Sequence, residues 1–219
     1  MRVLLLTDIH GDVEKLQKIL SREKYDTVLC AGDLSDAREF EDYESRLREV
    51  LDSFDQKGKM ARAVPGNMDP EEECVGQLID YRMNIHKKIA SFESFEAVGF
   101  GGGITPFGTP FEPEGSEIKD AVETLHQRMK ADNKVAVIHQ PPAETELDIA
   151  DGEHVGSSEV RELIQEKDFD LVLTGHIHES RGSDEIGGTP VVNPGPVMDG
   201  YYGIAEIEDR KIELELRSL

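Results

Sequence analysis

Two short stretches, VLLLTD at residues 3–8 and TVLCAGD at residues 27–33, share one design, a continuous apolar run that ends in an acidic residue. An apolar run of this length without alternation is typical of a strand that is buried on both faces. The segment between them has apolar residues at helical spacing from Val13 to Leu20, and Asp12 is placed to cap the start of that helix. A strand, a helix and a second strand in this order predict a βαβ unit, and therefore a parallel sheet.

The alternation of strands and helices continues along the chain, and the long loop GGGITPFGTPFEPEG (101–115) interrupts it once. We expect helices at 37–55, 71–79, 116–131 and 157–166, a strand and turn at 60–67, and strands at 134–140 and 170–178. We also expect a β-hairpin segment near the end, with Asp209 and Arg210 in its turn. The sequence contains no repeat and no linker. We therefore expect a single domain over residues 1–219.

Composition limits the class of protein. The chain has 219 residues, of which 37% are hydrophobic, and its net charge of -22 comes from 46 acidic against 24 basic residues. Such a surface repels nucleic-acid backbones and anionic lipid, and no stretch approaches the ~20 apolar residues of a membrane span. The two cysteines, Cys30 and Cys74, match no zinc or disulfide spacing, and this favours a reduced, cytoplasmic protein. An oligomer is compatible with the sequence.

Seven side chains that can bind metal ions stand at the ends of expected strands. They are Asp8, His10, Asp33, Asn67, His139, His176 and His178. Ligands in open α/β sheets gather outside the carboxyl ends of the strands, so these side chains should converge. Mixed nitrogen and oxygen ligands suit Mn, Fe, Zn or Ni better than Mg or Ca. GHIH (175–178) is the strongest single signal, because alternate residues of an extended segment can reach two adjacent metals.

Taken in order, five blocks of the sequence resemble those of the calcineurin-like metallophosphoesterase superfamily. The blocks are DIH (8–10), GDLSD (32–36), GNMD (66–69), HQPP (139–142) and GHIH (175–178), and NPGP (193–196) resembles a further loop of the small bacterial and archaeal members. The resemblance implies an α/β fold in which two mixed β-sheets pack as a sandwich flanked by helices. It also implies two divalent transition-metal ions, with Mn favoured and Ni, Fe or Zn as alternatives.

Carried over residue by residue, the resemblance implies two metal positions joined by one ligand. Asp8, His10 and His178 would hold one ion, Asn67, His139 and His176 would hold the other, and Asp33 would bridge them. Asp36 and Asp69 complete the blocks without being ligands, and we expect them to orient a ligand or to accept from a backbone N–H.

The implied activity is hydrolysis of a small phosphoester. Two cations ~3.5–4 Å apart can clamp a phosphoryl group and lower the pKa of a shared water, so that a metal-bridging hydroxide attacks phosphorus in line. The alternative is a catalytically weak or inactive protein-binding scaffold on the same fold. Retention of all seven ligand positions argues against the scaffold, which has no need of them.

Met68 departs from the family pattern. Most members have a histidine there, which contacts the phosphate and is often assigned to protonating the leaving oxygen. A methionine thioether can do neither, so we expect phosphodiesters rather than monoesters as substrates. His154, in the loop 141–155 after the His139 block, is the candidate replacement acid, whereas His86 and His126 are expected to be solvated or structural.

Overall fold

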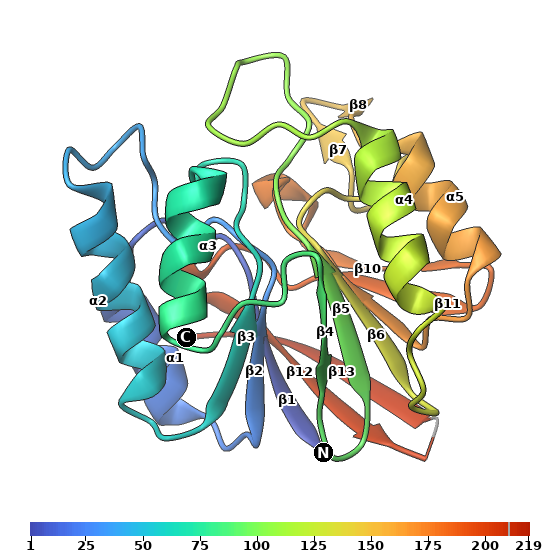
Figure 1. The fold of residues 1–219 in the computed structure, drawn as a ribbon, viewed down its shortest axis with the longest axis horizontal. Helices are drawn as coiled ribbons and strands as arrows, with labels where there is room; N and C mark the ends of the chain where they lie inside the picture. The colour runs from blue at the N-terminus through green and yellow to red at the C-terminus, as the bar shows by residue number, and fades with distance from the viewer. Residues whose placement is uncertain (210) are drawn as a thin grey trace.

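The computed structural model describes residues 1–209 and 211–219, so Arg210 of the expected final turn lies outside the described residues. The described part forms four layers, in which helices cover the outer faces of two packed sheets (Figure 1). The helices are α1 (Val13–Arg22), α2 (Tyr43–Asp55), α3 (Glu71–Asp80), α4 (Gly115–His126) and α5 (Ser158–Glu166). None of these described helices has the length and apolar character needed to cross a bilayer.

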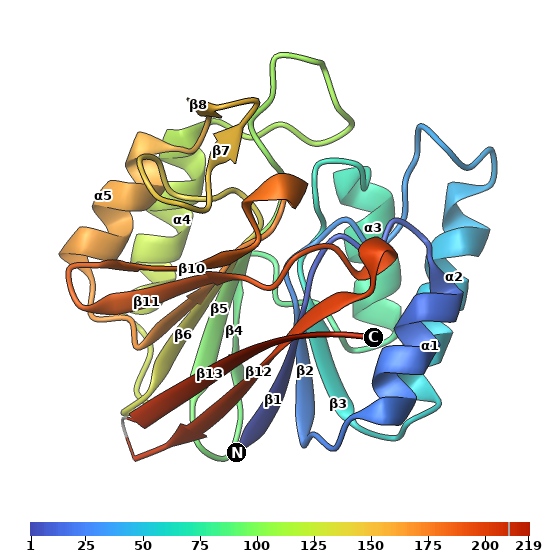
Figure 2. The same ribbon diagram turned by 180° about the vertical axis from the view of Figure 1, so that it is seen from behind.

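The first sheet has the strand order β13-β12-β1-β2-β3. Its members are β1 (Arg2–Leu6), β2 (Thr27–Cys30), β3 (Met60–Ala63), β12 (Tyr201–Glu208) and β13 (Lys211–Ser218). The strands β1, β2 and β3 are parallel, which confirms the predicted βαβ unit. The hairpin of β12 and β13 adds antiparallel strands at the edge beside β1, as the view from behind shows (Figure 2).

The second sheet has the order β10-β11-β9-β6-β5-β4 and is also mixed. Its members are β4 (Lys88–Ser91), β5 (Glu96–Phe100), β6 (Lys134–Ile138), β9 (Leu171–Leu173), β10 (Gly182–Ile186) and β11 (Thr189–Asn193). The four inner strands run parallel, and β4 and β10 are the antiparallel edges. The small hairpin of β7 (Ile149–Ala150) and β8 (Glu153–His154) and the short 3₁₀ helices η1 (His178–Ser180) and η2 (Val197–Asp199) lie in the connections.

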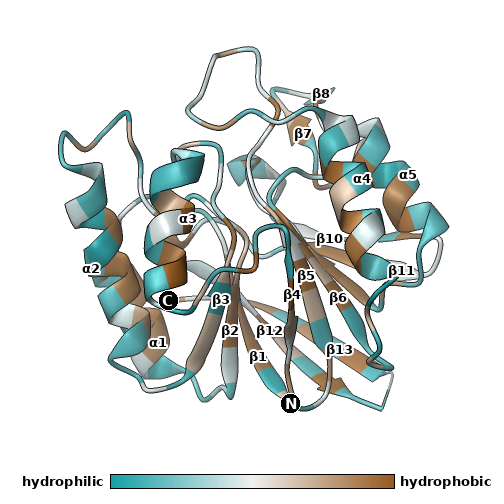
Figure 3. Ribbon diagram, viewed as in Figure 1, coloured by the Kyte–Doolittle hydropathy of each residue, from teal (hydrophilic) through white to brown (hydrophobic). Residues whose placement is uncertain are grey.

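Alternation of side chains along β1 explains how the layers are joined. Leu4 and Leu6 point into the apolar cluster under α1, α2 and α3, whereas Val3 and Leu5 point into the cluster between the two sheets. A third cluster lies between the second sheet and α4 and α5. The apolar stripes of the helices accordingly face the sheets in the hydropathy colouring (Figure 3). This arrangement confirms the predicted sandwich of two mixed sheets flanked by helices.

Several of the expected elements are shorter than their patterns indicated; the helix expected over 116–131, for example, ends at His126. The helix expected from residue 37 begins at Tyr43, because Asp36 and Asp42 each cap a separate turn with their side chains. The strand expected over 170–178 ends at Leu173, and His176 has a left-handed φ of 72°. The extended conformation expected for GHIH (175–178) was therefore wrong, because His178 already belongs to the 3₁₀ helix η1; the assignment of His176 and His178 to two different metals remains a prediction.

Candidate metal centre

The candidate ligands leave the carboxyl ends of strands in both sheets. Asp8 follows β1, Asp33 follows β2 and Asn67 comes shortly after β3, all in the first sheet. His139 directly follows β6 and His176 comes after β9, both in the second sheet. Because the sheets pack face to face, the loops that carry these residues meet at one end of the molecule (Figure 1).

Four of the seven candidate ligands adopt left-handed backbone angles, with φ of 52° at Asp8, 46° at His10, 47° at Asp33 and 72° at His176. Residues other than glycine rarely adopt this conformation, which costs ~1–3 kcal/mol and clusters at functional sites. Hydrogen bonds between the loops hold it, since Asp8 N donates to Gly32 O at 3.0 Å and His10 N donates to Asp33 O at 2.9 Å. The backbone is therefore strained where the side chains converge.

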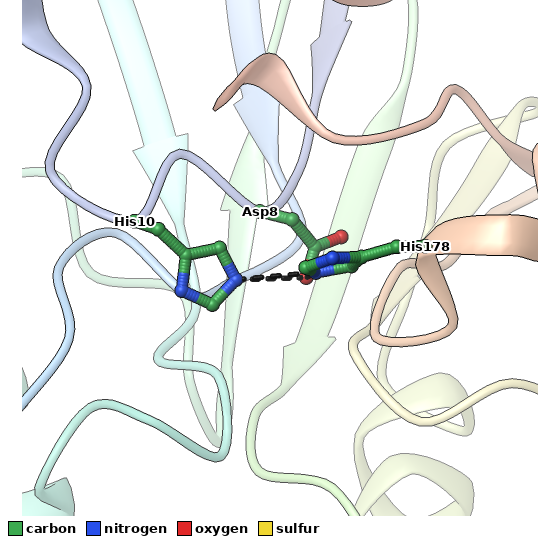
Figure 4. A group of neighbouring side chains, drawn as sticks. All are labelled: Asp8, His10 and His178. Carbon is green, nitrogen blue, oxygen red and sulfur yellow. Dashed lines mark hydrogen bonds and ion pairs between the residues drawn. The ribbon is translucent and has the colours of Figure 1, made fainter. Parts of the chain in front are cut away.

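Asp8, His10 and His178 form the first cluster of donor atoms (Figure 4). His10 Nε2 lies 3.2 Å from His178 Nε2, and Asp8 Oδ1 lies 3.4 Å from His178 Nε2 and 3.9 Å from His10 Nε2. The rings approach edge to face, and the donor atoms of the three side chains all lie within 4.8 Å of one another. A single ion between them would be within reach of all three side chains.

The second cluster centres on His139. Its Nε2 lies 3.0 Å from Asn67 Oδ1 and 3.4 Å from Asp33 Oδ2, and the ring of His176 lies 5.2 Å from its own ring, centroid to centroid. Asp8 also has a carboxylate oxygen close to the donor atoms of Asp33 and His139. Asp8 therefore reaches both clusters, which the sequence did not indicate.

Asp33 stands between the two clusters. Its Oδ2 lies 3.6 Å from His10 Nε2 in the first cluster and 3.4 Å from His139 Nε2 in the second. Its other oxygen is occupied, because Oδ1 accepts a hydrogen bond from Met68 N at 2.8 Å. One oxygen of Asp33 is thus left facing both groups of ligands.

The charges of the site fit divalent cations. Asp8 is fully buried and Asp33 is 2% exposed, and a buried carboxylate is costly unless it is paired. Within the described residues, the ion pairs of both carboxylates come from histidines alone, with no lysine or arginine beside them. Two buried carboxylates that converge with neutral nitrogen and amide donors make a suitable set of ligands for such ions.

The pKa values of the histidines also fit a site that can hold cations. Burial alone would lower the pKa of His10 and of His139, but neighbouring groups outweigh it and raise each pKa to about 9. The largest raising influence is the hydrogen bond to Asp36 for His10 and the charge of Asp33 for His139. Burial, and then the charge of His139, lower the pKa of His176 to about 4. Protons on these rings offset the same carboxylates that a cation would, so metal binding would displace protons.

Groups behind the ligands fix their orientation. Asp36 Oδ2 lies 3.4 Å from His10 Nδ1, and the carbonyl of Ala31 lies 2.5 Å from His139 Nδ1. The hydroxyl of Thr7 donates to Asp8 Oδ2 at 2.7 Å. With their Nδ1 atoms held in this way, both rings present Nε2 to the site. The sequence indicated Asp36 but gave no signal for Thr7 or for a backbone carbonyl.

Asp69 lies outside the clusters and joins the two loops that carry Asp33 and Asn67. Its buried carboxylate accepts from the backbone N–H groups of Leu34, Ser35 and Gly66. It also accepts from the hydroxyl of Tyr43 at 2.8 Å. Asp69 is thus placed to hold backbone N–H groups, the role expected of it from the sequence.

Two glycines let the loops approach the ligands. A Cβ on Gly66 would lie 2.0 Å from Asp33 Oδ1, and one on Gly103 would lie 2.9 Å from His176 Cε1 and 3.2 Å from Asn67 Oδ1. The distances to the carboxylate and to the ring are shorter than real contacts allow, so only glycine fits there. The triple glycine 101–103 therefore packs behind the second cluster.

A cleft of about 470 Å³ opens over the candidate ligands. His10, Asp33, Asn67, His176 and His178 line its floor, and Met68 lines it beside them. The side chain of His154 is exposed and is not among the described residues that line the cleft. His154 lies in β8, and its Nδ1 pairs instead with Asp148 Oδ1, 2.8 Å away. The structure does not bring the candidate acid to the candidate ligands.

His86 and His126 are buried, and His86 has a supporting role. Its Nδ1 accepts from Gly101 N at 2.9 Å, its Nε2 lies 3.1 Å from Glu71, and its ring packs against Phe100. It therefore anchors the glycine loop that passes behind the second cluster.

Comparisons with known proteins agree on the nature of this arrangement. A family model described as calcineurin-like phosphoesterase matches residues 1–180. A curated relative, the uncharacterized protein MJ1162 of Methanocaldococcus jannaschii, is 33% identical over 202 residues, which cover 90% of this chain and 88% of the relative.

Solved structures share the fold along the whole chain. The structure of TT1561 from Thermus thermophilus is 21% identical, with a TM-score of 0.77 and coverage of 98% of this chain and 97% of that chain. A dimetal phosphatase from Danio rerio is 12% identical, with a TM-score of 0.71 and coverage of 100% of this chain and 96% of that chain. At these identities the likeness concerns the fold alone.

Proposed function

The chain belongs to the calcineurin-like phosphoesterase family and is a metal-dependent phosphoesterase, and we propose that it uses two metal ions and acts on phosphodiesters. The observation that carries the proposal of two ions is the position of Asp33 Oδ2, 3.6 Å from His10 Nε2 and 3.4 Å from His139 Nε2. A single oxygen within reach of ligands from both clusters suits a ligand that two ions share.

In this proposal each ion has its own set of side chains. Asp8, His10 and His178 hold one, Asn67, His139 and His176 hold the other, and Asp33 is common to both. When bound, the ions supply positive charge for the phosphoryl oxygens and lower the pKa of water. Asn67 adds a ligand without adding charge to a site that already has two carboxylates. We propose Mn as the metal, with Ni, Fe or Zn as alternatives, because the donors mix imidazole with oxygen ligands.

The preference for phosphodiesters rests on the side chains that line the cleft. Met68 offers a thioether, which cannot donate a proton, and the histidines of the described lining, His10, His176 and His178, are all candidate ligands. Without a proton donor, the leaving oxygen must depart as an anion. This favours diesters with acidic leaving groups over monoesters of alkyl alcohols.

Replacement of Asp33 tests the shared ligand. We expect Asp33→Asn to abolish hydrolysis of bis(p-nitrophenyl) phosphate and to lower bound Mn²⁺ more than any change of a single terminal ligand does. Asp120→Asn, the same chemical change at an exposed position of α4, is the matched control. Metal analysis that finds unchanged stoichiometry in Asp33→Asn would rule out the shared position.

A substrate panel tests the reaction and the scaffold alternative together. The panel contains bis(p-nitrophenyl) phosphate, p-nitrophenyl phosphate and the alkyl monoester methyl phosphate, each with Mn²⁺, Ni²⁺ and Mg²⁺, so that both the ester class and the leaving group vary. We expect faster turnover of the diester, with Mn²⁺ most effective. Metal binding at full stoichiometry without hydrolysis of any of these esters would favour the scaffold on the same fold.

We further propose that residues 1–219 act as one domain, since the candidate ligands come from both sheets and neither sheet alone carries a complete cluster. The buried free thiols of Cys30 and Cys74 support a reducing, cytoplasmic setting. A net charge of -22 supports a small phosphoester rather than a nucleic acid as the partner.

A further inference from the structure

Exposed apolar side chains gather at the mouth of the candidate metal site. Six large hydrophobic side chains are exposed in the described part of the chain, and three of them, Ile104, Phe107 and Val155, line the cleft. Phe107 is 74% exposed, more than any of the others. Apolar side chains concentrated around one concave site are a mark of a binding surface.

The loop 104–112 forms one wall of the cleft and projects beside the hairpin β7–β8 (Figure 1). Arg38 holds the tip of this loop, because its Nη2 donates to the carbonyl of Phe107 at 2.9 Å and to that of Gly108 at 2.7 Å. The wall is therefore braced in position before any substrate arrives, which lowers the cost of binding.

The same wall is joined to the metal-binding turn at its base. Phe111 N donates to the carbonyl of the candidate ligand Asn67 at 3.1 Å, and Ile104 N donates to Gln140 Oε1 at 2.7 Å, next to His139. A group that rests on the wall thus has a fixed place relative to a phosphoryl group at the ligands.

The hydroxyl groups of the wall are already used as donors. Thr105 and Thr109 are the hydroxyl side chains among the described residues that line the cleft, and both donate to Glu112 Oε1, Thr109 at 2.7 Å. Their protons are not available to the edge of a nucleobase or to a sugar. The exposed side chains of Ile104 and Phe107 consequently give this wall an apolar surface.

Positive charge is scarce around the cleft. Arg38 is the one lysine or arginine among the described residues that line it, and its Nη2 already donates to two carbonyls. A substrate with several phosphates would need further cations to offset the field of a chain with a net charge of -22. The cleft therefore suits a substrate with one phosphoryl group.

We propose that the substrate is a single-phosphate ester with an apolar substituent of the size of an aromatic ring, which packs on Phe107 beside Ile104 and Val155. This inference rests on the proposed function, because the metal ions would hold the phosphoryl group. It adds the chemical class of the group at the other end of the cleft, and it assigns Phe107 as a residue that determines specificity.

Binding of non-hydrolysable phosphonates tests the inference without relying on turnover. Calorimetry on the Mn²⁺-loaded protein compares methylphosphonate with phenylphosphonate. We expect phenylphosphonate to bind about tenfold more tightly, the gain from removing roughly 55 Å² of apolar surface from water at ~25 cal/mol per Å². This margin, the ratio of the affinity for phenylphosphonate to that for methylphosphonate, should shrink in Phe107→Ser and Val155→Ser. It should persist in Ile79→Ser, which changes an exposed apolar residue outside the cleft. Equal affinities in the unmodified protein, or a margin unaffected by Phe107→Ser, would overturn the inference.

Nucleotides test whether the cleft disfavours a nucleobase and whether it disfavours a second phosphate. We expect thymidine 5′-phosphate to bind more weakly than phenylphosphonate, because the hydroxyl groups of the wall already donate to Glu112. We expect thymidine 3′,5′-bisphosphate to bind no more tightly than the monophosphate, because Arg38 is the one lysine or arginine among the described residues that line the cleft. The reverse order in either comparison overturns the corresponding part of the inference.

Hydrolysis of bis(p-nitrophenyl) phosphate by the same preparation separates this inference from the proposed function. Hydrolysis without a phenyl margin contradicts the inference and leaves the phosphodiesterase in place. A phenyl margin without hydrolysis supports the binding class and contradicts the phosphodiesterase.

Discussion

Replacing Asp69 with asparagine tests how the loops that carry Asp33 and Asn67 are held together. The carboxylate of Asp69 is fully buried and accepts four hydrogen bonds. Oδ2 accepts from Leu34 N at 2.9 Å and Gly66 N at 2.8 Å, and Oδ1 accepts from Ser35 N at 3.0 Å and the Tyr43 hydroxyl at 2.8 Å.

The amide of Asn keeps one of these two oxygens and puts an NH₂ group in place of the other. In either orientation at least one buried backbone N–H then loses its acceptor and faces a donor. Each unsatisfied buried donor costs ~1–3 kcal/mol, so the free energy of unfolding should fall by about 2–4 kcal/mol. Because the loosened loops carry Asp33 and Asn67, the affinity for Mn²⁺ should also fall, by ~10–100-fold, without being abolished.

Urea unfolding followed by circular dichroism, with EDTA present, measures the loss of stability in Asp69→Asn. Calorimetric titration with Mn²⁺ on the folded variant measures the loss of affinity. Asp120→Asn makes the same change at an exposed position of α4 and should alter the free energy of unfolding by no more than ~0.5 kcal/mol. If Asp69→Asn is as stable as this control and binds Mn²⁺ like the unmodified protein, the loops are held by other contacts and the reasoning fails.

Three further predictions concern the cleft, the surface and pH. General acid catalysis is worth ~10²–10⁴-fold. Met68→His should therefore raise kcat/KM most for esters with the least acidic leaving groups. A shallow dependence of kcat/KM on leaving-group pKa in the unmodified protein would contradict the absence of a proton donor. The Tm should rise over the first few hundred millimolar KCl, because exposed like charges are screened within ~10 Å at 0.1 M, and a flat or falling curve would mean that the acidic residues are already paired or well spread. Burial lowers the pKa of His86 to about 4, below the ~6.5 of an unfolded chain, so the unfolded state takes up the proton first and stability is lost as pH falls from ~6.5 towards 4. His86→Gln should lack this part of the pH dependence in urea unfolding, and parallel curves for the two proteins would refute it.

The alternation of strands and helices in the first half of the chain, and the acidic residues that follow the first two strands, could be predicted from the sequence. Asp8 and Asp33 each interrupt an apolar run, and a run that is buried on both faces is a local pattern. The convergence of the side chains at these strand ends then follows, because parallel strands bring their carboxyl ends to one edge of the sheet. The same local patterns overextended several elements. In two of them the reason is visible, because the side chains of Asp36 and Asp42 cap separate turns and the left-handed turn at His176 interrupts an otherwise strand-like pattern.

The sequence by itself determined which residue types stand at the strand ends, since the spacing of apolar and polar residues over a few positions encodes strands, helices and their ends. Tertiary structure decided how these residues are used. Arg38 meets the carbonyl of Phe107, which lies 69 positions along the chain, and His10 meets His178, which lies 168 positions along the chain. Such contacts form only when the two sheets pack face to face, because packing sets the distances between residues that are remote in sequence and local periodicity does not. For the same reason, the left-handed turns at Asp8 and His10 depend on hydrogen bonds to the neighbouring loop at 32–33, which no pattern within residues 3–10 contains.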